Sequence, residues 1–229
     1  MNFRDFENAF SSERISRYIA ACNGDKRRAM TLYRYNLRLS QEMFTLVSCF
    51  EVTLRNQIDK QMTAQHGNDW LRDLILPNGA FSNNHSVDTT RKIIEKAYYG
   101  LLQSGTYSHS KLLSEMEFGV WKYMFSNVQY RLTGRILLNV FPLKPISSRQ
   151  YQYDNAYIFH ELDYINNIRN RIAHHEPICF GRTVSIDTTY ALNRYSRIIK
   201  LLQWMDVDPP RLLYGLDHVK KVCNQVMGI

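Results

Sequence analysis

The stretch that decides the fold runs from residue 26 to residue 67, "KRRAMTLYRYNLRLSQEMFTLVSCFEVTLRNQIDKQMTAQHG". Apolar residues recur along it at steps of three and four, which places them on one face of an α-helix. Asp25 is a suitable N-cap, and His66-Gly67 marks the end. The pattern predicts one helix of about 40 residues, which must pack against several other helices or another subunit. The predicted stripe consists of Ala29, Leu32, Asn36, Leu39, Met43, Leu46, Phe50, Thr53 and Gln57, with Val47, Leu54 and Ile58 beside it.

The rest of the chain is predicted to form further helices. No stretch shows sustained alternation with a period of two, and glycine (10) and proline (6) are sparse, which favours helices over strands. A length of 229 residues fits one domain. We therefore predict a single all-α domain over residues 1–229, with Trp70 and Trp121 in its core. The expected elements are an amphipathic start at 3–21, a loop at 72–85, and helices from Ser86 or Asp88 to 103, at 110–126, from Ser148 to Pro177, at 187–205 and at 214–227.

Composition narrows the class of protein. Hydrophobic residues make up 45% of the chain, which is enough for a core and argues against disorder. No segment approaches the roughly 18 apolar residues of a membrane span, and the start "MNFRDFENAFSSER" lacks an apolar signal region. We expect a cytosolic (cytoplasmic) protein with no membrane partner. The formal net charge of +8 suits a polyanionic partner such as nucleic acid.

The four cysteines predict buried thiols. They form no CxxC pair, which excludes a zinc ribbon and a thioredoxin-like motif. The cysteines are Cys22, Cys49, Cys179 and Cys223.

The candidate site is "IRNRIAHHEPICF", residues 168–180, where basic and titratable groups gather at a predicted helix end. One interpretation is a metal site, but zinc ligands on a helix stand three or four residues apart. His174 and His175 are neighbours, about 100° apart on a helix, and we predict no metal there. A second interpretation is a helix terminus whose cations complement the helix dipole and whose polar side chains cap carbonyls.

The third interpretation is RNA cleavage without metal. That chemistry needs a base for the ribose 2′-OH, a cation for the phosphate and an acid for the 5′-oxygen. Histidine can act as base or acid near neutral pH, and arginine presents a permanently charged planar fork to phosphate. One Arg and one His supply half of such a site. A symmetry mate across a twofold axis would supply the other half.

The hexapeptide "RNRIAH", Arg169 to His174, resembles the arginine–four residues–histidine motif of HEPN ribonucleases. The surrounding blocks resemble the Abi-like branch, named for bacterial abortive infection. The resemblance implies an all-α HEPN-like helical bundle, usually a homodimer, that cuts RNA without metal or cofactor and leaves 2′,3′-cyclic phosphate ends. It also implies a composite active site from two protomers and a role in phage defence or as a toxin, for which an antitoxin would be a protein or an RNA. The blocks are "FEVTLRNQIDKQM" (50–62), "HGNDWL" (66–71), "EFGVWKYMF" (117–125) and "LDYINNIRNRIAHHEPI" (162–178).

The motif assigns roles to individual residues. Arg169 is expected to bind the phosphate and stabilise the transition-state charge, and His174 to act as general acid or base. Asn170 is expected to orient the phosphate or the histidine. His175 also fits the looser spacing of the motif and is the alternative histidine.

Three more residues are candidates for supporting roles. Glu161 lies eight residues before Arg169, about 80° round the helix, where it could steer a basic group. Arg171 and Arg182 are expected along the RNA path. A rival hypothesis is a non-catalytic RNA-binding or antitoxin-interacting helical module, although a pure binder needs no adjacent Arg, Asn and His. A further alternative is a metal-dependent hydrolase that uses His174, His175 and Glu176.

Overall fold

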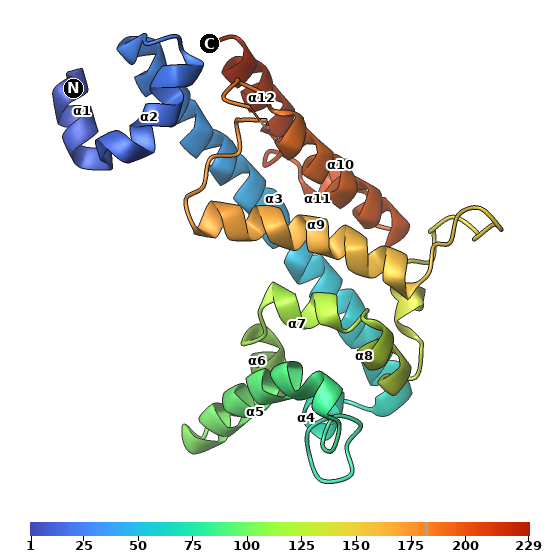
Figure 1. The fold of residues 1–229 in the computed structure, drawn as a ribbon. Coiled ribbons are helices and arrows are strands. Elements are labelled where there is room, and N and C mark those ends of the chain that lie inside the picture. Colours follow the sequence, from blue (N-terminus) through green and yellow to red (C-terminus); the bar gives the residue numbers. More distant parts are fainter. Residues whose placement is uncertain (182) are drawn as a thin grey trace. The chain divides into compact units, whose positions relative to one another are not determined.

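The structure is a computed structural model that describes residues 1–181 and 183–229. Its described residues form twelve α-helices, two short 3-10 helices and no sheet, which confirms the all-α prediction (Figure 1). The helices are α1 (Phe3–Phe10), α2 (Ser12–Ala21), α3 (Lys26–His66), α4 (Trp70–Asp73), α5 (Asp88–Gln103), α6 (His109–Ser114), α7 (Phe118–Tyr123), α8 (Asn127–Leu132), α9 (Asn155–Ala173), α10 (Thr189–Trp204), α11 (Pro209–Leu212) and α12 (Val219–Met227), with 3-10 turns at His85–Val87 and Leu137–Val140.

The chain divides into two compact units. The first contains residues 1–49, 167–200 and 208–229, and the second contains residues 50–166 and 201–207. Helices α3, α9 and α10 contribute residues to both units. The candidate site at 168–180 belongs to the first unit.

Helix α3 has the length and the buried face that the sequence predicts. Its start is capped by Asp25, whose Oδ1 accepts the backbone N–H groups of Arg27 (2.9 Å) and Arg28 (3.0 Å). Gly67 ends it with φ +90, a left-handed conformation that glycine adopts without steric cost. Every apolar member of the predicted stripe is buried, and so is Asn36. Burial of each Leu, Met, Phe, Val or Ile side chain among them contributes about 1.5–3 kcal/mol, so packing stabilises this helix along its length.

In the first unit, helices α1 and α2 pack on the start of α3 through aromatic rings. The centroids of Phe6 and Tyr33 lie 5.4 Å apart, and Tyr18 lies 5.0 Å from both Tyr33 and Phe180. The amphipathic start therefore exists, but as two helices. Ser11, with φ +69, separates them and caps α2 by accepting the Arg14 backbone N–H at 3.4 Å.

The end of the chain also packs within the first unit. Tyr195 of α10 donates its hydroxyl proton to Asp217 Oδ2 at 2.6 Å, and Lys220 Nζ of α12 lies 5.4 Å from the Tyr195 ring centroid. Figure 1 shows α12 beside α10 accordingly. The sequence pattern did not predict the short α11, which is capped by Asp208, whose Oδ1 accepts the Arg211 N–H at 3.3 Å.

In the second unit, helices α4, α5 and α6 pack against one another (Figure 1). Asp59 of α3 joins them, because its Oδ1 accepts hydrogen bonds from Trp70 Nε1 and His109 Nε2, both at 2.8 Å. Trp70 and Trp121 are buried, as predicted.

Two predicted helix boundaries in the second unit are wrong. The stretch 110–126 is broken between α6 and α7, where Met116 and Phe118 are both buried. A continuous helix would point these two side chains about 200° apart, so the break lets both enter the core. Helix α9 begins at Asn155 and not at Ser148, because the Ser148 hydroxyl instead accepts the Tyr151 N–H (3.1 Å) within a loop.

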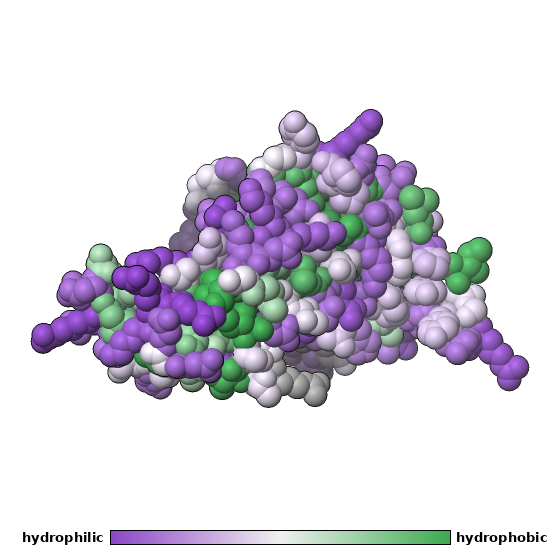
Figure 2. Space-filling model, turned by 90° about the horizontal axis from the view of Figure 1, so that it is seen from above, coloured by the Kyte–Doolittle hydropathy of each residue, from purple (hydrophilic) through white to green (hydrophobic). Residues whose placement is uncertain are grey.

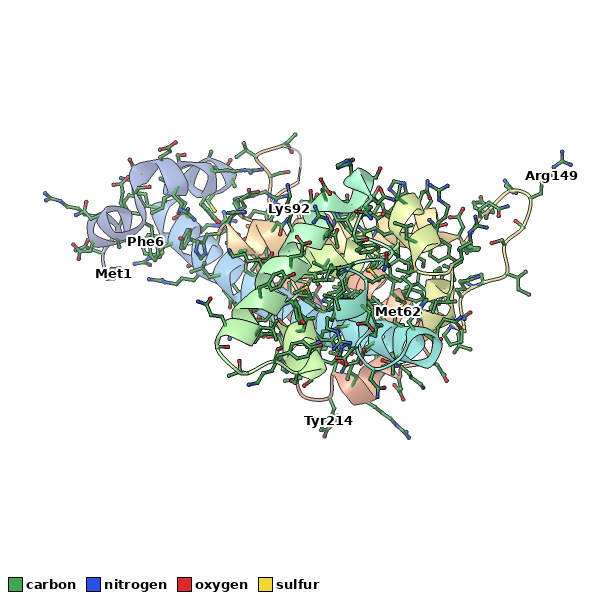
Figure 3. All side chains as sticks on the ribbon, turned by 90° about the horizontal axis from the view of Figure 1, so that it is seen from below. Met1, Phe6, Met62, Lys92, Arg149 and Tyr214 are labelled. Carbon is green, nitrogen blue, oxygen red and sulfur yellow. The ribbon has the colours of Figure 1, made fainter. Side chains whose placement is uncertain are left out.

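One face of the surface is mainly polar (Figure 2). On the face seen in Figure 2, hydrophilic residues dominate and hydrophobic ones lie between them in small groups. Figure 3 shows Arg149 and Tyr214 projecting from the ribbon. Three of the four cysteines are buried, Cys49 is partly exposed, and none is in a disulfide. In the part of the chain that the structure describes, no helix is both long enough and apolar enough to cross a membrane.

Candidate active site

Helix α9 ends in a turn that the structure defines closely. The His175 N–H donates to the Ile172 carbonyl at 3.0 Å, and the Glu176 N–H donates to the Arg171 carbonyl at 2.8 Å. This pair of bonds is a Schellman motif, which satisfies the last helical carbonyls. Pro177 follows directly and prevents the helix from continuing. The stretch is therefore a helix terminus, and backbone N–H groups cap its last carbonyls.

His175 occupies the position that glycine usually fills in this motif. Its φ is +56, a left-handed conformation that costs a residue with a Cβ roughly 1–2 kcal/mol. The surroundings hold it there, because Arg14 Nη1 donates to the His175 carbonyl at 2.9 Å. Three residues on, the Ile178 N–H donates to Oδ1 of the buried Asn36 at 2.9 Å. The turn is thus fixed from both sides, by α2 and by α3.

The three residues predicted to be catalytic lie together at this end of α9. His174 is exposed, while Arg169 and Asn170 are half-buried. Among the described residues, none of the three side chains has a hydrogen-bond or ion-pair partner. Their donors and acceptors are therefore available to a ligand, which a purely capping role for these side chains does not require.

Arg169 and His174 leave the helix in different directions. Five residues correspond to about 140° of rotation and 7.5 Å of rise along an α-helix. One protomer therefore places its arginine and its histidine on different sides of the helix end.

The supporting candidates have different surroundings. Arg171 reaches over its own turn, since Nη2 donates to the Pro177 carbonyl at 2.6 Å and Nε lies 3.2 Å from Glu176 Oε2. Its guanidinium also lies 4.7 Å from the Tyr190 ring centroid. Arg171 thus helps to hold the turn, and its contact with RNA stays a prediction. Glu161 is buried and belongs to the second unit. Arg182 lies outside the described residues.

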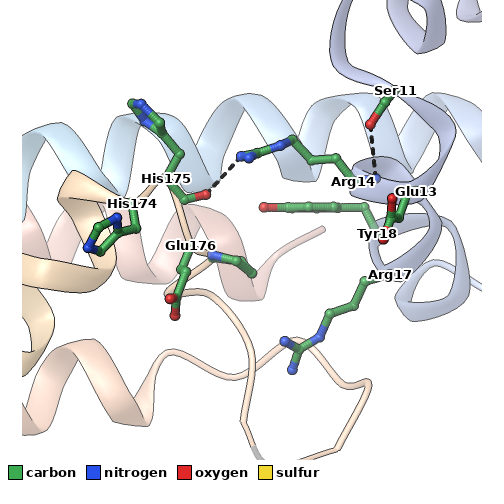
Figure 4. Close-up of a pocket in the computed structure, with 9 residues that line it drawn as sticks. Ser11, Glu13, Arg14, Arg17, Tyr18, His174, His175 and Glu176 are labelled. Atoms are coloured by element: carbon green, nitrogen blue, oxygen red, sulfur yellow. Dashed lines mark hydrogen bonds between the residues drawn. The ribbon is translucent and has the colours of Figure 1, made fainter.

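An open pocket of about 490 Å³ lies beside His174 and His175 (Figure 4). Its opposite wall comes from α2, which the sequence pattern did not connect with the site. The residues that line it are Ser11, Glu13, Arg14, Arg17, Tyr18, His174, His175, Glu176 and Pro177. The sequence places α2 far from the motif, since Arg14 precedes His175 by 161 positions, so only the two arginines in "SERISRY" hinted at a basic face.

Burial changes the proton affinity of two groups near this site. It raises the pKa of the Tyr18 phenol far above its ordinary value, so the hydroxyl keeps its proton. It also raises the pKa of the Cys179 thiol to about 12, which makes this cysteine a poor nucleophile. In the residues described, no three His, Cys, Asp or Glu side chains gather in a way that could hold a metal ion.

The chain was compared with models of protein families, with curated proteins and with solved structures. A family model described as "Abi-like protein" matches residues 2–179, which include α1 to α9 and the whole turn that follows α9. The searches of curated proteins and of solved structures gave no match. Since the family match covers most of the sequence, the chain belongs to the Abi-like protein family.

Proposed function

We propose that this protein is a metal-independent endoribonuclease of the HEPN type that works as a homodimer. The observation that carries the proposal is the set of Arg169, Asn170 and His174, whose side chains lie without partners at the fixed end of α9. A permanent cation and an imidazole are groups that this cleavage needs, and the Asn170 amide would orient the phosphate or the histidine. Of the three, His174 lines an open pocket that a nucleotide can enter.

The reaction follows from these groups. One histidine removes the proton from a ribose 2′-OH, and the 2′-oxygen attacks the adjacent phosphorus. The bond from phosphorus to the 5′-oxygen breaks, and a second histidine gives that oxygen a proton. Arginine stabilises the charge that grows on the phosphate oxygens. The products are a 2′,3′-cyclic phosphate and a free 5′-hydroxyl.

The need for both a base and an acid supports the dimer. Each protomer offers His174 and Arg169 on different sides of one helix end, which is half of the required set. A twofold axis through this region would bring two copies of each residue to one composite site. The proposed enzyme therefore needs its partner copy for chemistry.

Family membership supports a role in abortive infection. Cleavage of cellular RNA would arrest growth of an infected cell and limit the phage. Such an activity must be restrained in healthy cells, and we propose an antitoxin, either protein or RNA, as the restraint.

The test is RNA cleavage in the presence of EDTA. Arg169→Ala and His174→Ala should each reduce cleavage by at least about a hundredfold, because each removes a group that acts in the transition state. Matched controls are Arg211→Ala and His85→Ala, whose side chains are 89% and 100% exposed and lie outside the pocket. The controls should cut at the wild-type rate. Full activity of the Arg169→Ala/His174→Ala double variant would refute the proposal.

The ends of the products separate the rival mechanisms. Cyclic 2′,3′-phosphate ends support the proposed route, whereas 5′-phosphate ends and loss of activity on chelation would indicate a metal-dependent hydrolase. A non-catalytic RNA-binding module would bind RNA with a steep salt dependence and give no cut ends.

A further inference from the structure

The pocket beside His174 has a second wall that the proposed cleavage chemistry does not use. Helix α2 contributes Arg14, Arg17 and Tyr18 to this wall. Figure 4 shows the two arginines on either side of the Tyr18 ring, with the Tyr18 hydroxyl directed toward the turn at His175 and Glu176.

Both arginines are held in place by backbone carbonyls. Arg14 Nη1 donates to the His175 carbonyl (2.9 Å), and Arg17 Nη2 donates to the Gly181 carbonyl (3.3 Å). The Arg17 guanidinium also lies 4.5 Å from the Phe180 ring centroid. Each guanidinium has five N–H donors, so these bonds leave most of them free. A guanidinium already fixed in position loses less entropy when it binds a phosphate.

The Tyr18 hydroxyl adds a neutral donor to this wall of the pocket. The side chain is 3% exposed, and within the described residues its hydroxyl has no hydrogen-bond partner. Tyr18 lines the pocket, so its hydroxyl can donate one hydrogen bond to a ligand there. An acceptor oxygen of that ligand would accept this bond.

The charges around the pocket favour an anion. Of its two carboxylates, Glu176 is paired with Arg171 at 3.2 Å, and Glu13 is exposed in the first turn of α2. Arg14 and Arg17 therefore leave the wall with an excess of positive charge. Phosphate matches this wall in charge and in its number of acceptor oxygens.

We propose that Arg14, Arg17 and the Tyr18 hydroxyl form a second phosphate-binding subsite, which holds the RNA phosphate next to the one that is cleaved. The identity of the ligand rests on the proposed function, since an RNA at His174 presents its neighbouring phosphate to this wall. The subsite would fix the register of the strand across the end of α9. It is a binding site and takes no part in proton transfer.

The experiment measures binding without cleavage. All variants carry His174→Ala, and a labelled single-stranded RNA of 12 nucleotides is titrated by fluorescence anisotropy at several salt concentrations. Arg14→Gln/Arg17→Gln keeps an amide donor for each carbonyl but removes both charges. We expect about tenfold weaker binding and a salt slope lower by about 0.7, the value for one lost single-strand phosphate contact. The matched control is Arg4→Gln/Arg211→Gln, which removes the same charge from exposed positions outside the pocket.

The outcomes are distinct. Equal affinity of the glutamine pair and the control pair, or no RNA binding at all, would overturn the subsite. Arg14→Lys/Arg17→Lys restores the charge and should recover most of the affinity. If the glutamine pair fails to fold, Tyr18→Phe decides: a threefold loss supports the subsite and unchanged binding overturns it. A wild-type protein that binds RNA through these residues but never cuts it would refute the ribonuclease and leave the subsite standing.

Discussion

His175 has a structural role in the turn after α9, and its position beside His174 makes the choice of the catalytic histidine ambiguous in the sequence. It stands next to His174 in sequence and fits the looser spacing of the motif, so the sequence leaves both histidines as candidates. The structure separates their backbones: His174 continues the helix through its bond to the Asn170 carbonyl (2.9 Å), while His175 takes the left-handed position of the Schellman turn. That difference gives the two residues different mutational behaviour.

The substitution His175→Gly should stabilise the protein. Glycine adopts a φ of +56 without a clash, so the free energy of unfolding should rise by about 1 kcal/mol, measured by urea denaturation. If His174 is the working histidine, this variant keeps its RNA cleavage. A stable His175→Gly protein that no longer cuts RNA would transfer the catalytic role to His175.

Asp187 gives a prediction of pH dependence. Its Oδ1 accepts the N–H of Thr189 at 2.8 Å at the start of α10, and hydrogen bonds from Thr189 lower the pKa of this carboxyl. A carboxyl whose pKa is lower in the folded state stabilises the fold at pH values above its unfolded-state pKa, which is near 3.9. That stabilisation is lost as the pH falls through the folded-state pKa. Asp187→Ala should therefore cost about 1 kcal/mol at neutral pH.

The same comparison at low pH is the check. Urea melts of wild type and Asp187→Ala should differ at pH 7 and converge as the pH falls below about 4. Asp187→Asn, which keeps an acceptor oxygen, should retain most of the stability but lose the pH dependence. A difference between wild type and Asp187→Ala that grows toward low pH would contradict the assigned role.

At the scale of elements, the period of the apolar residues predicts a helix correctly where one continuous face of that helix is buried. Helix α3 was predicted with both ends, because a stripe of buried residues runs from Ala29 to Ile58 and the sequence marks the ends with Asp25 and Gly67. The break between α6 and α7 was not, because Met116 and Phe118 are both apolar and either fits a helical pattern. The start of α9 was misplaced because a serine can cap a helix or close a loop, and Ser148 closes a loop.

The contact between α3 and the turn after α9 depends on Asn36. This residue is buried, and its side chain is the acceptor for the Ile178 N–H. Asn36→Leu keeps the number and branching of the side-chain heavy atoms but leaves that N–H buried without a partner, which should lower the free energy of unfolding by about 1–3 kcal/mol. Arg38→Leu, at an exposed position on the same helix, should change it by no more than about 0.5 kcal/mol. Equal stability of the two variants in urea melts would show that the bond contributes little.

At the scale of the whole molecule, sequence reasoning reached only part of the candidate site. Arg169, Asn170 and His174 are neighbours in sequence, so local spacing was enough to find them. Arg14, Arg17 and Tyr18 are brought by the fold to the pocket that His174 lines, and no local pattern links them to the motif. The formal net charge of +8 indicated a polyanion, but it could not say which of the 29 basic residues face it.

A composite site predicts how activity depends on the mixture of subunits. If each site needs His174 from both protomers, only wild-type homodimers cut RNA, and activity falls as the square of the wild-type fraction. An equal mixture of wild-type and His174→Ala subunits, allowed to exchange, should then retain about one quarter of the activity of the same total amount of wild type. Independent sites in each protomer would retain about one half. The measurement is RNA cleavage as a function of the wild-type fraction across a series of mixing ratios. A quadratic curve supports the shared site, whereas a straight line would reject it and indicate cleavage by a single protomer.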